Sequence, residues 1–218
     1  QALLAPLRVG DVAAVSVLAV TRTEDRAALY LGTNQGVRKS TTLGSAVAFV
    51  ERNAGLTALN VWSLAHDPTQ ATRLYAGTER GLYLSINSGL TWIPAPTTGS
   101  TLLPELVGVL DVVSGRTPST LLFVRTSDHR LFTSIDAGVN WENVTPPGSP
   151  IQYGIALEPG NAQSLYSCTA EGAKRSVNAG GDWAPLPTTG NGPLDCQAIA
   201  VHPGSSQYVY VVDSDHVV

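Results

Sequence analysis

Two short runs of charged residues stand out as groups that could hold a ligand. Glu79-Arg80 and Asp128-His129-Arg130 each follow one short apolar segment and precede another, as the tip of a β-hairpin does. Polar and charged groups carried by loops on a rigid scaffold commonly form sites for sugars or peptides. The predicted contact residues are Glu79, Arg80, Asp128, His129, Arg130 and Tyr153. The alternative for each residue is an ordinary solvated loop position.

The C-terminal end carries potential metal donors in Asp213, Asp215 and His216. A hairpin turn explains Asp-Ser-Asp equally well, because aspartate and serine are common turn residues. No group of Cys and His residues has the spacing of a zinc site. We therefore predict no metal and no cofactor, and we assign no catalytic residue.

Cys168 and Cys196 are the two cysteines of the chain, too few for a disulfide scaffold. The strands described below place them at similar heights in neighbouring units, where they could form a bond. The alternative is a pair of small, buried, apolar side chains. Sequence alone leaves both readings open, since a bond requires a suitable Cα separation.

One eight-residue stretch recurs along the chain and indicates which structural elements hold the candidate residues in place. Ser85-Ile-Asn-Ser-Gly-Leu-Thr-Trp92 recurs as 134–141 and 176–183, and 40–44 keeps only its serine and glycine. An Asp or Asn side chain can accept hydrogen bonds from backbone N–H groups two or three residues on. The glycine two places later tolerates the positive φ of a tight turn, and the tryptophan begins the next strand and covers the turn. The residues of the three copies are Ser85, Asn87, Gly89, Trp92, Ser134, Asp136, Gly138, Trp141, Ser176, Asn178, Gly180 and Trp183.

Short apolar segments repeat around each copy in the same order. The second unit is the clearest, with strands predicted at 61–68, 73–78, 81–85 and 91–94. The aromatic residue of the second strand recurs at spacings of 45, 48, 43 and 44 residues, as Tyr30, Tyr75, Phe123, Tyr166 and Tyr210. A four-stranded unit with this period is typical of a propeller blade, so the fold class is all-β: a β-propeller of four-stranded antiparallel blades in one domain.

The two ends of the chain suggest how the propeller closes. Residues 189–218 supply three strands of a fifth blade, and residues 1–9 resemble a fourth strand. If Leu3 to Leu7 pairs beside Asp215 to Val218, the ring closes and leaves no exposed sheet edge. We favour this five-bladed ring over part of a six- to ten-bladed one. The predicted complete blades are residues 10–51, 52–97, 98–147 and 148–188.

The recurring stretch resembles the Asp-box, or bacterial neuraminidase repeat, whose pattern is Ser-x-Asp-x-Gly-x-Thr-x-Trp. With the flanking strands, the resemblance covers nearly the whole chain and extends to sortilin-type receptors, xyloglucan-hydrolysing propellers, sialidases and the photosystem II assembly propeller. In these families the box is structural, so its acidic residue is a poor candidate for catalysis. The shared blade implies the fold and not the activity.

Two of the families that the chain resembles are enzymes, but the sequence does not show their full sets of catalytic residues. Sialidases use three arginines around a carboxylate with a Tyr–Glu pair, but no surrounding motif indicates that three arginines converge here. The candidates are Arg38, Arg80, Arg125, Arg130 and Arg175. Xyloglucanases place two acidic residues in a cleft between two propellers, and this chain supplies at most one. We therefore favour a non-catalytic module that docks a protein or glycan on its loop face. The alternatives are a glycoside hydrolase of the Asp-box class and a structural subunit of a larger complex.

The composition limits the kinds of partner and the cellular location expected for the protein. The net charge of −4 and the 14% of charged residues offer no basic field, which argues against nucleic acid. No apolar run is long enough to span a bilayer. Methionine is absent and the first residue is Gln1, which indicates a mature or trimmed product. A removed signal peptide would explain this, and the alternative is a sequence truncated for another reason. The expected location is secreted, periplasmic or cell-surface.

Overall fold

A computed structural model of the chain describes residues 15–23, 26–40, 48–95, 103, 107–116, 120–187, 196–205 and 208–213. These residues form antiparallel β-sheets, and none of them lies in a helix. Among them, no helical segment exists that is long and apolar enough to cross a membrane. The prediction of an all-β, propeller-type fold with four-stranded antiparallel blades is confirmed.

Four sheets have four strands each, and each follows the chain order from one strand to the next. The first sheet contains β1 (Val15–Thr23), β2 (Arg26–Thr33), β3 (Gly36–Ser40) and β4 (Phe49–Glu51). The second contains β5 (Val61–Asp67), β6 (Gln70–Thr78), β7 (Gly81–Ser85) and β8 (Ile93–Pro94). The third contains β9 (Val109–Arg116), β10 (Thr120–Thr126), β11 (Leu131–Ser134) and β12 (Glu142–Asn143). The fourth contains β13 (Ile151–Glu158), β14 (Asn161–Thr169), β15 (Gly172–Ser176) and β16 (Ala184–Pro185). β17 (Cys196–Val201) and β18 (Val209–Asp213) form a final pair.

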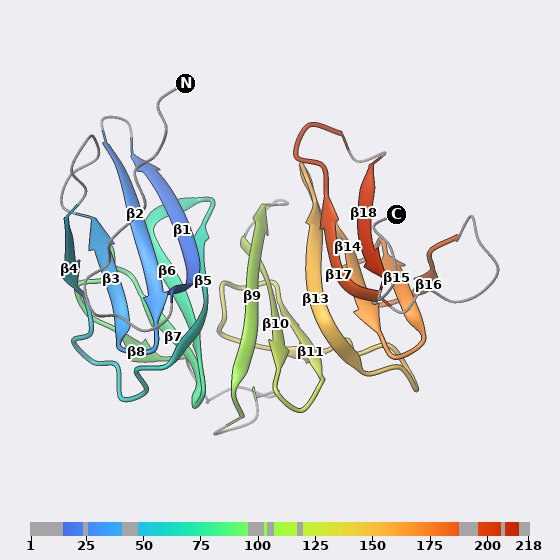
Figure 1. The fold of residues 1–218 in the computed structure, drawn as a ribbon, viewed down its shortest axis with the longest axis horizontal. Helices are drawn as coiled ribbons and strands as arrows, with labels where there is room; N and C mark the ends of the chain where they lie inside the picture. The colour runs from blue at the N-terminus through green and yellow to red at the C-terminus, as the bar shows by residue number, and fades with distance from the viewer. Residues whose placement is uncertain are drawn as a thin grey trace.

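The sheets stand side by side in a row (Figure 1). The first strand of each sheet packs on that of the next, from β1 to β5, β9, β13 and β17. In Figure 1 the first sheet lies at the left, and the β17–β18 pair lies at the right beside the fourth sheet. The segments expected to close a five-bladed ring, Leu3 to Leu7 and Asp215 to Val218, lie outside the described residues. The five-bladed ring, the larger ring and the proposed blade limits therefore stay predictions.

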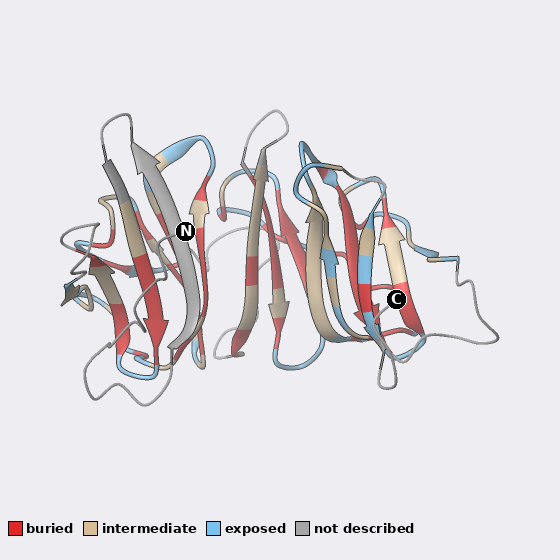
Figure 2. Ribbon diagram, turned by 45° about the horizontal axis from the view of Figure 1, so that its top comes forward, coloured by how far each residue is buried: buried red, intermediate tan, exposed pale blue. Residues whose placement is uncertain are grey.

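Burial is concentrated where neighbouring sheets meet (Figure 2). The second-strand aromatics of the four sheets, Tyr30, Tyr75, Phe123 and Tyr166, are at most 2% exposed. Tyr210, their counterpart on β18, is 46% exposed. The core is thus a series of sheet-to-sheet contacts, and the outward face of the final pair has no such cover among the described residues.

The three recurring stretches form the same tight turn. In each, the serine Oγ accepts a hydrogen bond from the glycine N–H four residues on, at 2.9, 2.9 and 2.8 Å. The glycines Gly89, Gly138 and Gly180 have φ values of +77°, +95° and +92°, as expected. The residue before each glycine also has a positive φ, near +58°, which the sequence did not reveal. We call these segments the box turns (85–92, 134–141 and 176–183).

Two details of the box turns differ from expectation. In all three turns the Asp or Asn side chain accepts a hydrogen bond from the N–H four residues on, rather than two or three. Asp136 Oδ1 lies 2.8 Å from Asn140 N and also accepts from Val139 N, three residues on, at 3.1 Å. The tryptophan precedes the fourth strand instead of starting it. The two consecutive residues of positive φ extend the turn, so both contacts fall one residue later along the chain.

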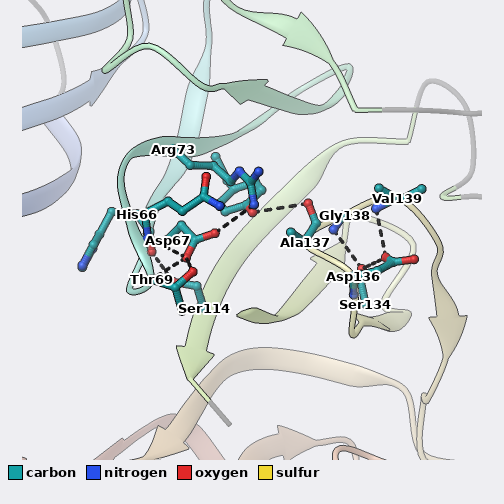
Figure 3. A network of polar contacts seen from close by, with 12 residues as sticks. His66, Asp67, Thr69, Arg73, Ser114, Ser134, Asp136, Ala137, Gly138 and Val139 are labelled. Carbon is teal, nitrogen blue, oxygen red and sulfur yellow. Dashed lines mark hydrogen bonds and ion pairs between the residues drawn. The ribbon is translucent and has the colours of Figure 1, made fainter. Parts of the chain in front are cut away.

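Each box turn packs against the sheet before it. Tyr30 Oη donates to Ser88 O at 3.1 Å, and Tyr75 Oη donates to Ala137 O at 3.3 Å. In both contacts the acceptor belongs to the residue of positive φ that precedes the glycine. Burial and the nearby Asp67 carboxylate raise the pKa of Tyr75, so its hydroxyl remains a donor. Figure 3 shows this contact beside the Asp136 turn.

A buried carboxylate fixes the turn between β5 and β6. Asp67 Oδ1 accepts from Thr69 N at 2.7 Å and Thr69 Oγ1 at 2.6 Å, and Oδ2 pairs with Arg73 Nη1 at 3.2 Å (Figure 3). A charge at this depth is tolerated because it is both paired and hydrogen-bonded. Asp67 is therefore assigned a structural role.

We expect the Asp136 turn to show a distinct acid dependence. Partial burial raises the pKa of Asp136, but hydrogen bonds from Asn140 and Ser134 outweigh this effect and leave the pKa below its ordinary value of 3.8. Ionised Asp136 then stabilises the fold above pH 3.8, and this contribution is lost as the pH falls through the lowered folded-state pKa. Asp136→Asn, which mimics Asn87 and Asn178, should cost at most about 1 kcal/mol at pH 7, because solvent screens this exposed position, and progressively less as the pH falls through the lowered folded-state pKa.

Urea unfolding of wild type and Asp136→Asn at several pH values measures this difference. Asn87→Asp is the matched control, since it places the same carboxylate in the second sheet, where the Thr91 hydroxyl can donate to it, and the variant should gain acid dependence. An equal difference between wild type and Asp136→Asn at pH 7 and at low pH would contradict the assignment.

Candidate functional site

The turns between the second and third strands lie at one end of the sheets, and we call this surface the loop face. The box turns lie at the other end, where Ser88 N bonds Thr72 O and Ala179 N bonds Gln163 O, next to the turns between first and second strands. The predicted contact residues at the tips of the second and third sheets therefore share the loop face.

A buried threonine anchors each tip of the loop face. Thr33, Thr78 and Thr169 each donate to the carbonyl three residues on, at 2.8, 2.9 and 2.8 Å, and accept from the N–H two residues on. Thr126 donates to Arg130 O at 3.1 Å. Sequence analysis missed this role, although a threonine ends the second strand in four units. The tips are consequently rigid supports for their charged residues.

The third tip brings together Asp128, His129 and Arg130. Arg130 Nε donates to Asp128 Oδ2 at 2.7 Å, and Arg130 Nη2 binds the same oxygen. Partial burial raises the pKa of Asp128, but hydrogen bonds from Arg130 and Thr126 outweigh it and hold the pKa below its usual value. His129 has a φ of +65°, and its carbonyl accepts from Ile151 N of the fourth sheet at 3.0 Å. The side chains of this tip thus stabilise the turn and its contact with the next sheet.

The second tip carries Glu79 and Arg80. Arg80 is exposed, whereas Glu79 is half-buried and its N–H donates to Asn60 O at 3.3 Å. Glu79 Oε2 is inaccessible to solvent and has no hydrogen-bond partner among the described residues. A buried carboxylate oxygen without a donor carries a desolvation cost. Of the predicted contact residues at the tips, Glu79 is the one with a buried side-chain oxygen that lacks a donor among the described residues.

Tyr153 lies on β13, half-buried, against the cluster around Cys168 and Cys196. The described contacts link the third tip to the fourth sheet through Ile151, two residues before Tyr153. They do not join Glu79 and Arg80 to Asp128. That all six residues act on one ligand stays a prediction.

The carboxylates of the loop face are mostly paired with a cation of their own sheet. Asp111 binds Arg125 at 2.6 Å, Asp128 binds Arg130, and Glu171 binds Lys174 at 2.7 Å. A hydrogen bond from Lys174 lowers the pKa of Glu171. The two loop-face carboxyls with a shifted pKa are thus held ionised, whereas a general acid of a glycosidase requires a raised pKa.

The candidate arginines are distributed over separate ion pairs. Beyond Arg125 and Arg130, Arg38 pairs with Glu51 at 3.3 Å and Arg175 pairs with Glu158 at 3.0 Å. Each acid belongs to the same sheet as its arginine. Four of the five arginines are therefore engaged by carboxylates rather than gathered around a common anion.

The cysteine question is settled by the structure. Cys168 on β14 and Cys196 on β17 form a disulfide with a Cα separation of 5.2 Å. The bond joins the fourth sheet to the final pair, which confirms the expectation of similar heights in neighbouring units.

Two further observations concern other kinds of site. Within the described part of the chain, no three His, Cys, Asp or Glu side chains gather as a metal site, and Asp215 and His216 lie outside that part.

A pocket of about 230 Å³ lies away from the loop face, between the turns at Gly115 and Gly160. It contains none of the predicted contact residues.

Sequence analysis also missed Trp62 of β5. Trp62 is partly exposed, and its ring lies so close to Gly108 that a Cβ there would come within 2.5 Å of Cζ3 and 3.3 Å of Glu79 O. An aromatic ring therefore adjoins the backbone of Glu79 on the loop face. The available signal was a large aromatic residue in the second position of a first strand, which was interpreted only as part of the strand.

Comparison with known proteins identifies the fold. No protein-family model matches the sequence, and a search among curated proteins finds no match. Similar solved structures include the GH74 xyloglucanase of Xanthomonas campestris (TM-score 0.70, 18% identity, 92% of this chain and 35% of that one). An ancestral GH74 enzyme has a TM-score of 0.65 at 18% identity, over 95% of this chain and 31% of that one. The extracellular domain of BT4673 from B. thetaiotaomicron has a TM-score of 0.62 at 15% identity, over 91% and 26%.

This chain thus spans about a third of the length of the two enzymes and about a quarter of the BT4673 domain. At these identities the likeness concerns the arrangement of the strands. The fold shared by this chain and its structural neighbours is of the β-propeller type.

Proposed function

We propose that this chain is an extracytoplasmic, non-catalytic binding module whose loop face binds a glycan. The observation that carries the proposal is the state of the loop-face carboxylates: Asp111, Asp128 and Glu171 are all engaged in ion pairs. Paired, ionised carboxylates suit a rigid binding surface better than proton transfer. The recurring turns are proposed to be Asp-boxes with a structural role.

A glycan is preferred over a protein ligand for two reasons. The loop face offers a partly exposed aromatic ring, Trp62, beside the backbone of Glu79. Sugar rings have apolar faces that can stack on such an aromatic ring. Three similar structures are GH74 enzymes, and one of them is titled a xyloglucanase, which makes xyloglucan the first ligand to try.

The proposed location follows from the disulfide between Cys168 and Cys196. Such bonds persist in oxidising compartments and are rare in reducing ones. We therefore place the module in a secreted, periplasmic or cell-surface setting.

Affinity electrophoresis in gels containing xyloglucan, other neutral polysaccharides or anionic polysaccharides tests the proposal, with calorimetry for any hit. We expect retarded migration on at least one polysaccharide, with no release of reducing ends on prolonged incubation. Unretarded migration on every polysaccharide would reject glycan binding.

The second candidate is a glycoside hydrolase, favoured by the GH74 enzymes among the similar structures. It predicts release of reducing ends from xyloglucan, abolished by replacing two carboxylates roughly 5 to 9.5 Å apart. Reducing ends that appear with wild type and not with Glu79→Gln would overturn the non-catalytic proposal.

A further inference from the structure

Each first strand carries the same irregularity at its loop-face end. Two consecutive residues of the second strand pair with two residues of the first strand that are not consecutive. One residue of the first strand lies between them without a pairing partner. In the second sheet, for example, Val61 faces Thr78 and Ser63 faces Gly77, so Trp62 is extra. The skipped residues are Ser16, Trp62, Leu110, Gln152 and Gln197. A β-bulge of this kind re-aims a side chain and often lies beside a functional site.

The extra residue is the one that reaches the surface. Its predecessor is buried in four units, where Val61, Val109, Ile151 and Cys196 are at most 1% exposed. Trp62, Leu110 and Gln197 are partly exposed, and Gln152 is exposed. A regular strand would place a buried residue and an outward residue in strict alternation. In these four units the bulge therefore presents one additional side chain without disturbing the core.

The bulges of the second and third sheets lie beside the backbone of Glu79. The ring of Trp62 covers Gly108, two residues before Leu110, and lies beside the Glu79 backbone. Glu79 Oε2 is buried and lacks a donor among the described residues. A ligand resting on Trp62 would lie beside the backbone of Glu79, whereas Oε2 stays enclosed.

The bulge of the fourth sheet is held by the third. Arg125 Nη1 donates to Gln152 O at 3.1 Å, while Arg125 Nε donates to Asp111 Oδ2 at 2.6 Å. This ion pair fixes the Gln152 backbone and leaves its side-chain amide exposed. Because β5, β9, β13 and β17 pack in succession, the four bulged residues follow one another across the sheets.

From this arrangement we infer that Trp62, Leu110, Gln152 and Gln197 form one continuous binding row for an extended, uncharged oligosaccharide. The inference rests on the proposed function and specifies its ligand class. Trp62 provides the face on which a sugar ring stacks. Leu110 contacts the next apolar face, and the two glutamine amides exchange hydrogen bonds with hydroxyls further along. The four side chains carry no charge, so the row selects neutral glycans over anionic ones.

The test measures binding of neutral and anionic oligosaccharides by wild type and variants of the full chain. Trp62→Ala is expected to weaken neutral-glycan binding at least about ten-fold, and the double variant Gln152→Ala/Gln197→Ala about three- to ten-fold. Gln163→Ala is the matched control, because Gln163 is an exposed glutamine on β14 near the opposite face, and it should bind like wild type. Thermal unfolding of each variant checks that it is folded.

The outcomes separate the inference from the proposed function. If wild type binds a neutral glycan and both row variants bind it equally well, the row is wrong and glycan binding stands. A preference for anionic oligosaccharides would also overturn the row. If wild type binds no glycan, both proposals fail. Should Trp62→Ala not fold, the glutamine double variant decides, since it alters side chains exposed at the surface.

Discussion

Replacing Trp92 by alanine is expected to destabilise the protein by about 4 kcal/mol. The indole is 2% exposed and packs in a cluster with Tyr30, Val37 and Val61, which joins the first two sheets. Its Nε1 donates to Arg52 O at 2.8 Å, a carbonyl that the variant would leave without this donor. Cavity formation and the lost hydrogen bond act in the same direction, so the effect should be among the largest for a single substitution.

Chemical denaturation monitored by circular dichroism measures this change. Trp92→Phe is the matched control: it keeps most of the ring and removes the donor, so we expect a loss of about 1 to 2 kcal/mol. Trp62→Ala, at a partly exposed position, should cost less than Trp92→Ala. Equal costs at Trp62 and Trp92 would show that Trp92 does not join the sheets as described.

Removal of the disulfide should have the second-largest effect, on the order of 3 kcal/mol. The bond closes a loop across a sequence separation of 28 residues, and constraining the unfolded chain over that length accounts for most of this figure. Both cysteines are buried in a small cluster with Ala173 and Val211. The bond also attaches a two-stranded pair to the fourth sheet, and a pair of this size is marginal by itself.

The double variant Cys168→Ala/Cys196→Ala tests this prediction by calorimetry and by limited proteolysis. We expect a lower melting temperature and early cleavage near β17 and β18, with the first three sheets protected for longer. Ala173→Ser, in the same cluster without a cross-link, controls for local packing. A melting temperature within about 1 °C of wild type would contradict a stabilising role.

The repeated turns made most of the fold predictable. Serine, an acidic or amide residue, glycine and tryptophan recur at fixed spacing, and each has a local role. The serine hydroxyl and the Asp or Asn side chain accept hydrogen bonds from backbone N–H groups. The glycine adopts a positive φ, and the tryptophan ring covers the turn. Local chemistry of this kind is visible in sequence because it depends on neighbours in the chain. The contact from Tyr75 to Ala137 joins residues 62 positions apart and was beyond such reasoning.

The site was less predictable for a related physical reason. Hairpin tips could be located, and Glu79, Arg80, Asp128, His129 and Arg130 do lie at them. What sequence could not show is that Asp128 and Arg130 neutralise one another, whereas Glu79 has an oxygen without a donor. The bulges were missed because a single extra residue breaks the alternation by which strands are recognised. Trp62 was consequently assigned to a strand and not to the surface.

The exposure of Tyr210 distinguishes the final strand pair from the other sheets. At the equivalent positions of the first two sheets, a tyrosine ring is capped by the turn that follows, whereas 46% of Tyr210 meets water. Tyr208 and Val212 beside it are 59% and 38% exposed, so this end of the array presents a strip of solvated hydrocarbon. Covering this strip with further apolar surface would remove hydrocarbon from water, which is the main favourable contribution to burial.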